Sequence, residues 1–276
     1  MANWEPSFAI NAGISLLTLR EDDEDAVRVE VASASGKKRA LYDIFLLLCD
    51  RIPGFSDTDD WDSVQYRTDR YQLEKGMCAA QTEDNHTLKT ELPKWKSCNW
   101  DPPLNPDTKH NRGLAHPQCA MLLAPISVVW ENDEARNRFL TNYEPPMTAK
   151  QLWPAFMYED GKGNVNNLKK GLLRSQIMIR AARAILFPPS VANAEDGPDH
   201  QSNRKTKADT YGMSGVTPGF LAYVAVGLRF ALSSEKSFNN RGGIFDYERF
   251  YNDIVTYLND ATCKTETSDL ITWWNG

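Results

Sequence analysis

The sequence predicts a mainly α-helical protein: a single helical domain with a long irregular, proline-rich insert and a central buried helix. Residues 216–238 contain a capping threonine, then a proline at the first helical position, then apolar residues on every face. Residues 245–260 carry one apolar stripe at helical spacing behind Asp246, the expected N-cap. Prolines at 93, 102, 103, 106, 117 and 125 exclude a long helix between residues 92 and 125.

The remaining elements follow from periodicity and from stop signals. Residues 37–53 place Leu41, Ile44, Phe45, Leu48 and Cys49 on one helical face. We expect one or two helices over 62–92 and an extended buried segment or short strand over 122–130. A short helix should follow Asn132 or Asp133, a long helix should cover 167–187, and a last short helix should follow Ser268 or Asp269.

Composition divides the chain into a tail and a body. Residues 1–36 end in an acidic run followed by small residues, which predicts a disordered tail before a helical domain at 37–276. Residues 188–214 contain almost nothing that could pack, so we expect a long mobile loop there.

Charge and cysteine usage narrow the class of protein. The net charge is −6, so nucleic acid would be bound only through a local basic patch. No apolar run reaches the roughly 20 residues of a membrane helix, and the first residues lack the basic region of a signal peptide. The five cysteines form no CxxC pair. We therefore expect an intracellular protein, cytoplasmic or nuclear, that makes no membrane contact.

The stretch DTKHNRGLAHPQC (107–119) is the strongest candidate for a metal site. It holds His110, His116 and Cys119, but only the last two form a close pair, with a proline between them. Structural zinc sites use four ligands in tighter pairs, so we expect no metal here. We expect instead a structured loop in which His116 bonds to backbone and Arg112-Gly113 makes a tight turn.

No motif identifies a catalytic centre or a cofactor. The chain has no G-x-S-x-G, no Walker A loop and no G-x-G-x-x-G, so we expect no bound cofactor. Lys169, Lys170 and Arg174 form a basic cluster that could touch phosphates or could be a solvated helix face. Arg229 lies among apolar residues, so it requires a partner, either an acid such as Asp246 or Asp253 in a structural ion pair or a ligand.

An ordered series of blocks is similar to a known family. The blocks are NRGLAHPQCAMLLAP, QLWPAFMYED, KKGLLRS, VTPGFLAYVAVGLRFALSS, FDYERFYNDIVTYL and DLITWWN, between about residues 90 and 276. They resemble an uncharacterised family of fungal proteins, expanded in mushroom-forming basidiomycetes and labelled only as a domain of unknown function. This chain departs from the family pattern at Ala124, where the pattern has cysteine, and at His110. Arg112, Gly113 and His116 match it. The expansion resembles that of genes carried with mobile elements.

Two functional hypotheses follow. The first is a non-enzymatic interaction protein that binds another protein or, through its basic patch, nucleic acid, with an association with mobile elements as one context. The second is an enzyme with an unrecognised site around Arg112, His116 and Arg229, which requires these residues to converge on one pocket.

Overall fold

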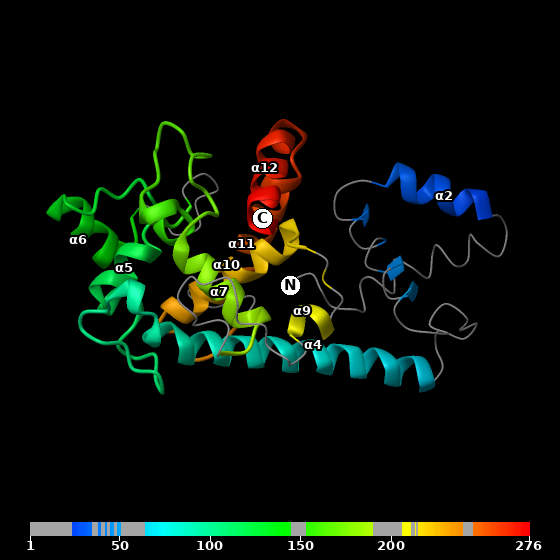
Figure 1. Ribbon diagram of the computed structural model, residues 1–276, viewed down its shortest axis with the longest axis horizontal. Coiled ribbons are helices and arrows are strands. Elements are labelled where there is room, and N and C mark those ends of the chain that lie inside the picture. The colour runs from blue at the N-terminus through cyan, green and yellow to red at the C-terminus, as the bar shows by residue number, and fades with distance from the viewer. Residues whose placement is uncertain are drawn as a thin grey trace. The chain divides into compact units, whose positions relative to one another are not determined.

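A computed structural model describes residues 24–34, 64–144, 153–189, 206–210, 213, 215–239 and 245–276, together with 38, 39, 42, 45, 46, 49 and 50. The chain forms two compact units, Met1–Gln81 and Thr82–Gly276, whose arrangement relative to one another is not determined (Figure 1). The tail boundary expected at residues 36 and 37 lies outside the described residues and stays a prediction.

The mainly α-helical prediction is confirmed. In the described part of the chain there is no strand, only isolated bridges such as Pro125 to Pro154. The α-helices are α2 (Glu24–Ser33), α4 (Val64–Glu91), α5 (Pro117–Leu123), α6 (Asp133–Asn142), α7 (Gln176–Leu186), α9 (Lys207–Thr210), α10 (Pro218–Leu232), α11 (Tyr247–Asn259) and α12 (Lys264–Asn275), and short 3-10 turns connect several of them.

The predicted central helix is α10. Every residue from Leu221 to Leu232 except Tyr223 is buried, and the helix packs against α11, α7 and α5 (Figure 1). The carboxyl-terminal part of α4 crosses α10 closely, because a Cβ at Gly227 would lie 2.9 Å from Leu88 Cδ1. The Tyr223 hydroxyl donates to Asp84 at 2.6 Å and ties the same two helices together.

Three predicted helix starts are confirmed by their capping bonds. Thr217 accepts from the Phe220 amide, Asp246 from the Arg249 amide, and Asn132 from the Ala135 amide. Each bond satisfies one amide that an isolated helix end would leave unpaired. The helix expected over 37–53 is also present at the positions that the structure describes there.

Two predicted helices have the wrong bounds. The helix expected over 167–187 begins only at Gln176, because Ser175 caps it and residues 169–174 form a loop. Gly171 and Leu173 in this loop have φ of +72° and +60°, which no α-helix contains. The final helix begins at Lys264, ahead of the expected caps Ser268 and Asp269.

Helices also occur where the sequence predicted none. Part of the expected disordered tail is α2. In the expected loop 188–214, α9 is held by a capping box: Thr206 Oγ1 accepts from the Asp209 amide, and Asp209 accepts from the Thr206 amide. Lys207 then pairs with Asp84 of α4 at 2.9 Å.

The expected strand or extended segment at 122–130 is not formed as predicted. Leu122 and Leu123 end α5, Pro125 makes one isolated bridge, and turns follow. Because Pro117 occupies the first position of α5 and His116 caps it, the helix can form inside the proline-rich insert.

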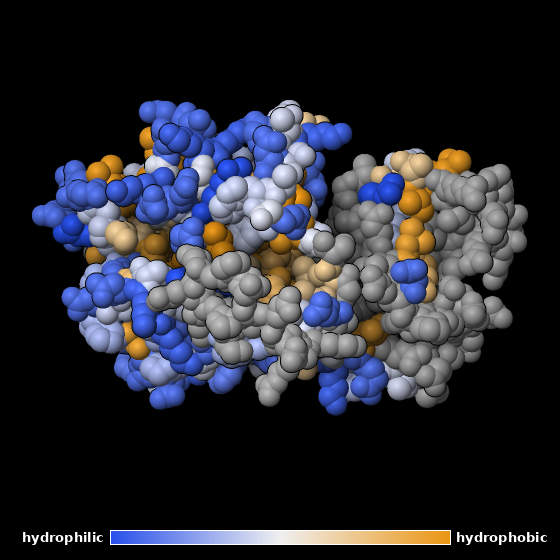
Figure 2. Space-filling view, viewed as in Figure 1, coloured by the Kyte–Doolittle hydropathy of each residue, from blue (hydrophilic) through white to orange (hydrophobic). Residues whose placement is uncertain are grey.

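Hydrophilic side chains cover most of the described surface on the face that Figure 2 shows. Among the described residues of 82–276, the exposed large hydrophobic side chains are Met121, Val129, Tyr143, Val165 and Trp273, of which Trp273 is the largest. Among the described residues no helix has the length and apolar character that crossing a membrane requires.

Candidate functional site

The six candidate residues lie in two different environments. Arg112 and His116 have no exposed surface, and Arg229 is 2% exposed. Lys169, Lys170 and Arg174 instead line one open pocket. The contacts of each group decide which of them is available to a ligand.

Arg112 joins the ends of two helices. Its guanidinium donates to the carbonyl oxygens of Lys89 at 2.7 Å, Asn105 at 2.8 Å and Ala231 at 2.9 Å. Lys89 lies in the last turn of α4 and Ala231 in the last turn of α10. Carbonyls at a helix carboxyl end carry partial negative charge and lack partners within the helix. The buried guanidinium therefore supplies hydrogen bonds to carbonyls at the carboxyl ends of both α4 and α10.

Lys109 is a second cation at the end of α10. Its Nζ donates to the Phe230 carbonyl at 2.6 Å and lies 3.2 Å from the centre of the Phe230 ring. Burial lowers the pKa of Lys109 from 10.5 to about 7, with a further lowering by the Arg112 charge, against which Glu235 acts in the opposite direction. The Lys109 amine therefore changes between its charged and neutral forms near pH 7.

This pKa predicts a stability that rises with pH. Between about pH 7 and 10.5 the unfolded chain holds a proton on Lys109 that the folded chain has lost, so unfolding becomes less favourable as pH rises. We expect a gain of roughly 2 kcal/mol between pH 7 and 9 in urea unfolding. Above pH 9 the gain should be offset, because burial raises the pKa of the Cys119 thiol to about 12 and keeps it protonated only when folded. Lys109→Met should abolish the rise; a rise that persists in this variant would contradict the assignment.

His116 caps α5 and bonds to backbone, as expected. Its Nδ1 accepts from the Cys119 amide at 3.3 Å, and its Nε2 lies 2.7 Å from the Pro102 carbonyl. Since Nδ1 accepts, Nε2 carries the proton and donates to Pro102. Both ring nitrogens are therefore engaged. Gly113, with φ of +67°, makes the expected tight turn, where a Cβ would lie 3.0 Å from the Ser234 amide nitrogen.

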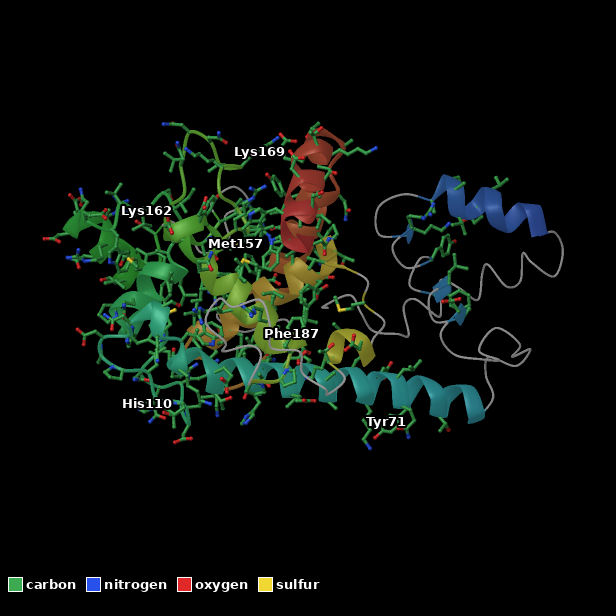
Figure 3. The ribbon with its side chains drawn as sticks, viewed as in Figure 1. Tyr71, His110, Met157, Lys162, Lys169 and Phe187 are labelled. Carbon is green, nitrogen blue, oxygen red and sulfur yellow. The ribbon has the colours of Figure 1, made fainter. Side chains whose placement is uncertain are left out.

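The two histidines of the stretch 107–119 have different surroundings. His110 is exposed, as Figure 3 shows, and its Nδ1 lies 2.6 Å from the Thr108 hydroxyl. Cys119 is fully buried on α5. Among the described residues, no group of three or more His, Cys, Asp or Glu side chains is placed to hold a metal ion.

Arg229 has a different acidic partner from those predicted. Its Nη1 lies 4.0 Å from Glu235 Oε1, and the Tyr247 hydroxyl donates to that same oxygen at 2.8 Å. The guanidinium carbon is 3.4 Å from the centre of the Phe245 ring. The acidic partner expected for Arg229 is thus Glu235 and not the suggested Asp246 or Asp253: Asp246 caps α11, and Asp253 lies 3.7 Å from Arg249. Burial lowers the pKa of Arg229, which Tyr247 and Glu235 oppose.

The three residues of the enzyme hypothesis therefore support the fold. The side chains of Arg112, His116 and Arg229 are sealed from solvent, and their polar contacts are with the protein itself. A substrate would need accessible groups with unsatisfied hydrogen-bonding capacity. The geometry of these residues gives the enzyme hypothesis no support.

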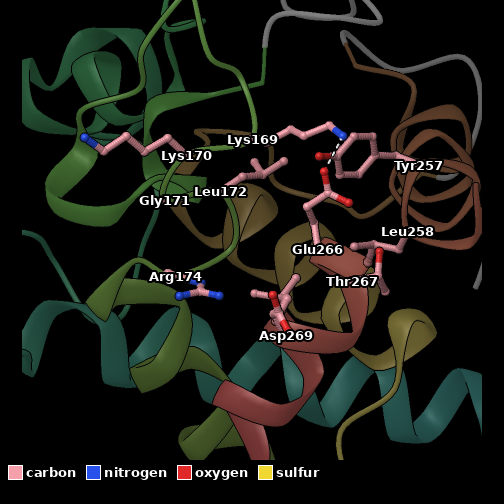
Figure 4. A pocket seen from close by; sticks show the side chains of 11 residues that line it. Lys169, Lys170, Gly171, Leu172, Arg174, Tyr257, Leu258, Glu266, Thr267 and Asp269 are labelled. Carbon is pink, nitrogen blue, oxygen red and sulfur yellow. Dashed lines mark hydrogen bonds and ion pairs between the residues drawn. The ribbon is translucent and has the colours of Figure 1, made fainter. Parts of the chain in front are cut away.

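The basic cluster, by contrast, lines a pocket of about 250 Å³. One wall is the loop 169–174, and the other is formed by the end of α11 and the first turns of α12 (Figure 4). The lining residues are Lys169, Lys170, Gly171, Leu172, Arg174, Tyr257, Leu258, Glu266, Thr267, Asp269 and Leu270.

The backbone of loop 169–174 is held in an unusual conformation. Leu173 is buried at positive φ, which is rare for a bulky side chain and costs about 1–3 kcal/mol. Its amide donates to Met157 and its carbonyl accepts from Trp274 Nε1 at 2.9 Å. At Gly171 a Cβ would lie 3.1 Å from Glu159 Cβ, so a side chain there would crowd the neighbouring segment. Trp274 of α12 thus fixes the loop that forms the opposite wall.

Charges of both signs meet in the pocket. Lys169 pairs with Glu266 at 2.7 Å, a contact that raises the pKa of Lys169 and lowers that of Glu266. The Arg174 guanidinium lies 5.2 Å from the Trp273 ring, and Trp273 is 40% exposed. In Figure 4 Arg174 and Asp269 point toward one another across the pocket, while Lys170 points away from its centre.

Sequence reasoning found one wall of this pocket and missed the other. Asp269 was expected only as a possible helix cap and no sequence pattern distinguished Glu266, although a spacing of three residues places the two side chains on one helical face. Trp273 was not distinguished from Trp274, because neighbouring residues on a helix face different directions and the sequence does not say which faces the core.

The comparisons add a family but no activity. No curated protein and no solved structure matches this chain. A family model matches residues 75–276, a range that holds the whole second unit and every residue of the pocket. The chain belongs to the family of unknown function DUF6698.

Proposed function

We propose that this chain is a non-enzymatic interaction protein that binds a protein partner through the pocket and the adjoining Trp273. The observation that carries this proposal is the Arg174–Trp273 pair at the edge of the pocket. Tryptophan and arginine dominate the binding energy of protein interfaces, because both bury large surfaces and can still form polar bonds. The pocket is smaller than the usual range for cofactors or drug-sized ligands but has room for partner side chains.

A protein partner suits the pocket better than nucleic acid. Glu266 and Asp269 share the pocket with the basic residues, and Glu266 already neutralises Lys169. A phosphate in this position would meet two carboxylates, and the whole chain carries a net charge of −6. We propose that the protein acts inside the cell, which agrees with its five widely spaced cysteines, none of which forms a CxxC pair.

Selection of random twelve-residue peptides displayed on phage, with the immobilised full chain as target, tests the proposal. We expect enriched peptides that bind the wild type and Lys162→Ala but lose at least about tenfold in affinity with Arg174→Ala or Trp273→Ala. Lys162 is a matched control because it is exposed and outside the pocket (Figure 3).

Two results would overturn the proposal. One is the absence of any enriched peptide, or enriched peptides whose affinity changes in neither Arg174→Ala nor Trp273→Ala. The other is binding of random single- or double-stranded nucleic acid at physiological salt that is lost when Lys169, Lys170 and Arg174 are neutralised together, which would favour the nucleic-acid hypothesis.

A further inference from the structure

Arg174 and Asp269 are the two charged groups that the pocket leaves available at its centre. Lys169 and Glu266 form an ion pair with one another at 2.7 Å, and Lys170 points away from the centre of the pocket (Figure 4). Arg174 and Asp269 face one another without an ion pair between them in the described structure. One side of the space therefore offers only hydrogen-bond donors and the other, ionised, only acceptors.

This arrangement selects among ligand chemistries. A carboxylate or phosphate would bond to Arg174 but would be repelled by Asp269. A lysine or arginine of a partner would bond to Asp269 but would be repelled by Arg174. A carboxamide presents a carbonyl acceptor and an NH₂ donor on one carbon, so it can satisfy both walls without carrying charge.

We propose that the pocket holds the carboxamide side chain of a glutamine or asparagine from the protein partner. Its carbonyl accepts from Arg174, its NH₂ group donates to Asp269, and its aliphatic stem lies against Leu172 and Leu270, which also line the pocket. The neighbouring Trp273 covers the partner backbone at the edge. This inference rests on the proposed function, since it names the chemistry that the same site recognises.

The pocket surroundings support an uncharged ligand. Tyr257, at the far end of the pocket from Arg174, is partly buried, and burial raises its pKa, so its hydroxyl stays neutral at physiological pH. The three basic and two acidic side chains of the lining leave little net charge to attract a charged group. Selectivity for an amide then comes from the direction of the hydrogen bonds. A ligand that only donates leaves Arg174 without a hydrogen bond, and one that only accepts leaves Asp269 without one.

Synthetic peptides from the selection, measured by fluorescence anisotropy against the full chain, test this proposal. We expect a glutamine or asparagine at the anchor position. Replacing it in the peptide with Glu or with Lys should each weaken binding by at least about tenfold, because one wall then faces a like charge.

A double-mutant cycle assigns that discrimination to the pocket. Asp269→Asn replaces the acceptor-only wall with an amide, so the penalty for the peptide Gln→Glu change should fall toward onefold. Glu134→Gln, an exposed change on α6 outside the pocket, should leave the penalty unchanged. Both substitutions are conservative and exposed, so the fold is retained.

The outcomes separate the two proposals. Peptides that depend on Trp273 but carry an acidic, phosphorylated or basic anchor would leave the interaction site standing and would overturn the carboxamide. An unchanged penalty in Asp269→Asn would do the same. Failure to select any peptide would overturn both.

Discussion

Replacement of Arg112 with methionine is expected to lower the free energy of unfolding by about 3–5 kcal/mol. The substitution keeps a long apolar stem but removes every bond to the carbonyls of Lys89, Asn105 and Ala231. The Arg112 side chain has no exposed surface. Water therefore cannot reach these carbonyls in place of the guanidinium unless the surrounding structure rearranges. Urea unfolding followed by circular dichroism measures the change.

Arg138→Met is the matched control for this prediction. Arg138 lies on α6, is 60% exposed in its side chain and pairs with Glu144 at 3.3 Å, so its loss should cost no more than about 1 kcal/mol. If Arg112→Met were as stable as Arg138→Met, Arg112 would have no role in joining α4 to α10. Arg112 would then again be a candidate for a functional role.

The neighbouring tryptophans of α12 should behave in opposite ways. Trp274→Ala is expected to cost roughly 3 kcal/mol, because it removes core packing and the bond to the Leu173 carbonyl. Since Leu173 holds the loop at positive φ, the same change should also abolish peptide binding. Trp273→Ala should cost no more than about 1 kcal/mol, the loss of its contact with Arg174 included, while it weakens binding at least about tenfold.

Measuring unfolding and peptide affinity on both variants separates these roles. Trp274→Phe provides a further control, since it keeps much of the packing and loses only the indole bond, for a cost of about 1 kcal/mol. Equal loss of stability in Trp273→Ala and Trp274→Ala would contradict the division between a supporting and an exposed tryptophan.

Local signals in the sequence predicted three helix starts correctly but failed at the loop 169–174. Thr217, Asp246 and Asn132 cap helices through bonds to amides three residues ahead, so the sequence contains all the information that each bond needs. The run of Leu and Lys before Ser175 also favours helix. It is overridden by the distant partners Met157 and Trp274, which no local pattern reveals.

The roles of the buried arginines were equally hidden. Arg112 bonds to carbonyls 23 and 119 residues away. Because every residue has a backbone carbonyl, the sequence does not show which ones accept these bonds. Burial of Arg229 was correctly inferred from its apolar neighbours, but Glu235 becomes its partner only because the chain turns back after α10 ends. The basic residues of the pocket could be named from sequence, whereas their acidic counterparts required the packing of α12 against the loop.

The indole N–H signals of the protein provide the most direct test of the central claim that the partner binds beside Trp273. They can be followed by ¹H–¹⁵N NMR during titration with a selected peptide and assigned by single Trp→Phe variants. The Trp273 signal should shift progressively, while that of Trp100, whose Nε1 donates to the buried Leu92 carbonyl at 2.9 Å, should not move. An unmoved Trp273 signal with shifts elsewhere would contradict the claim and place the interaction surface outside the pocket.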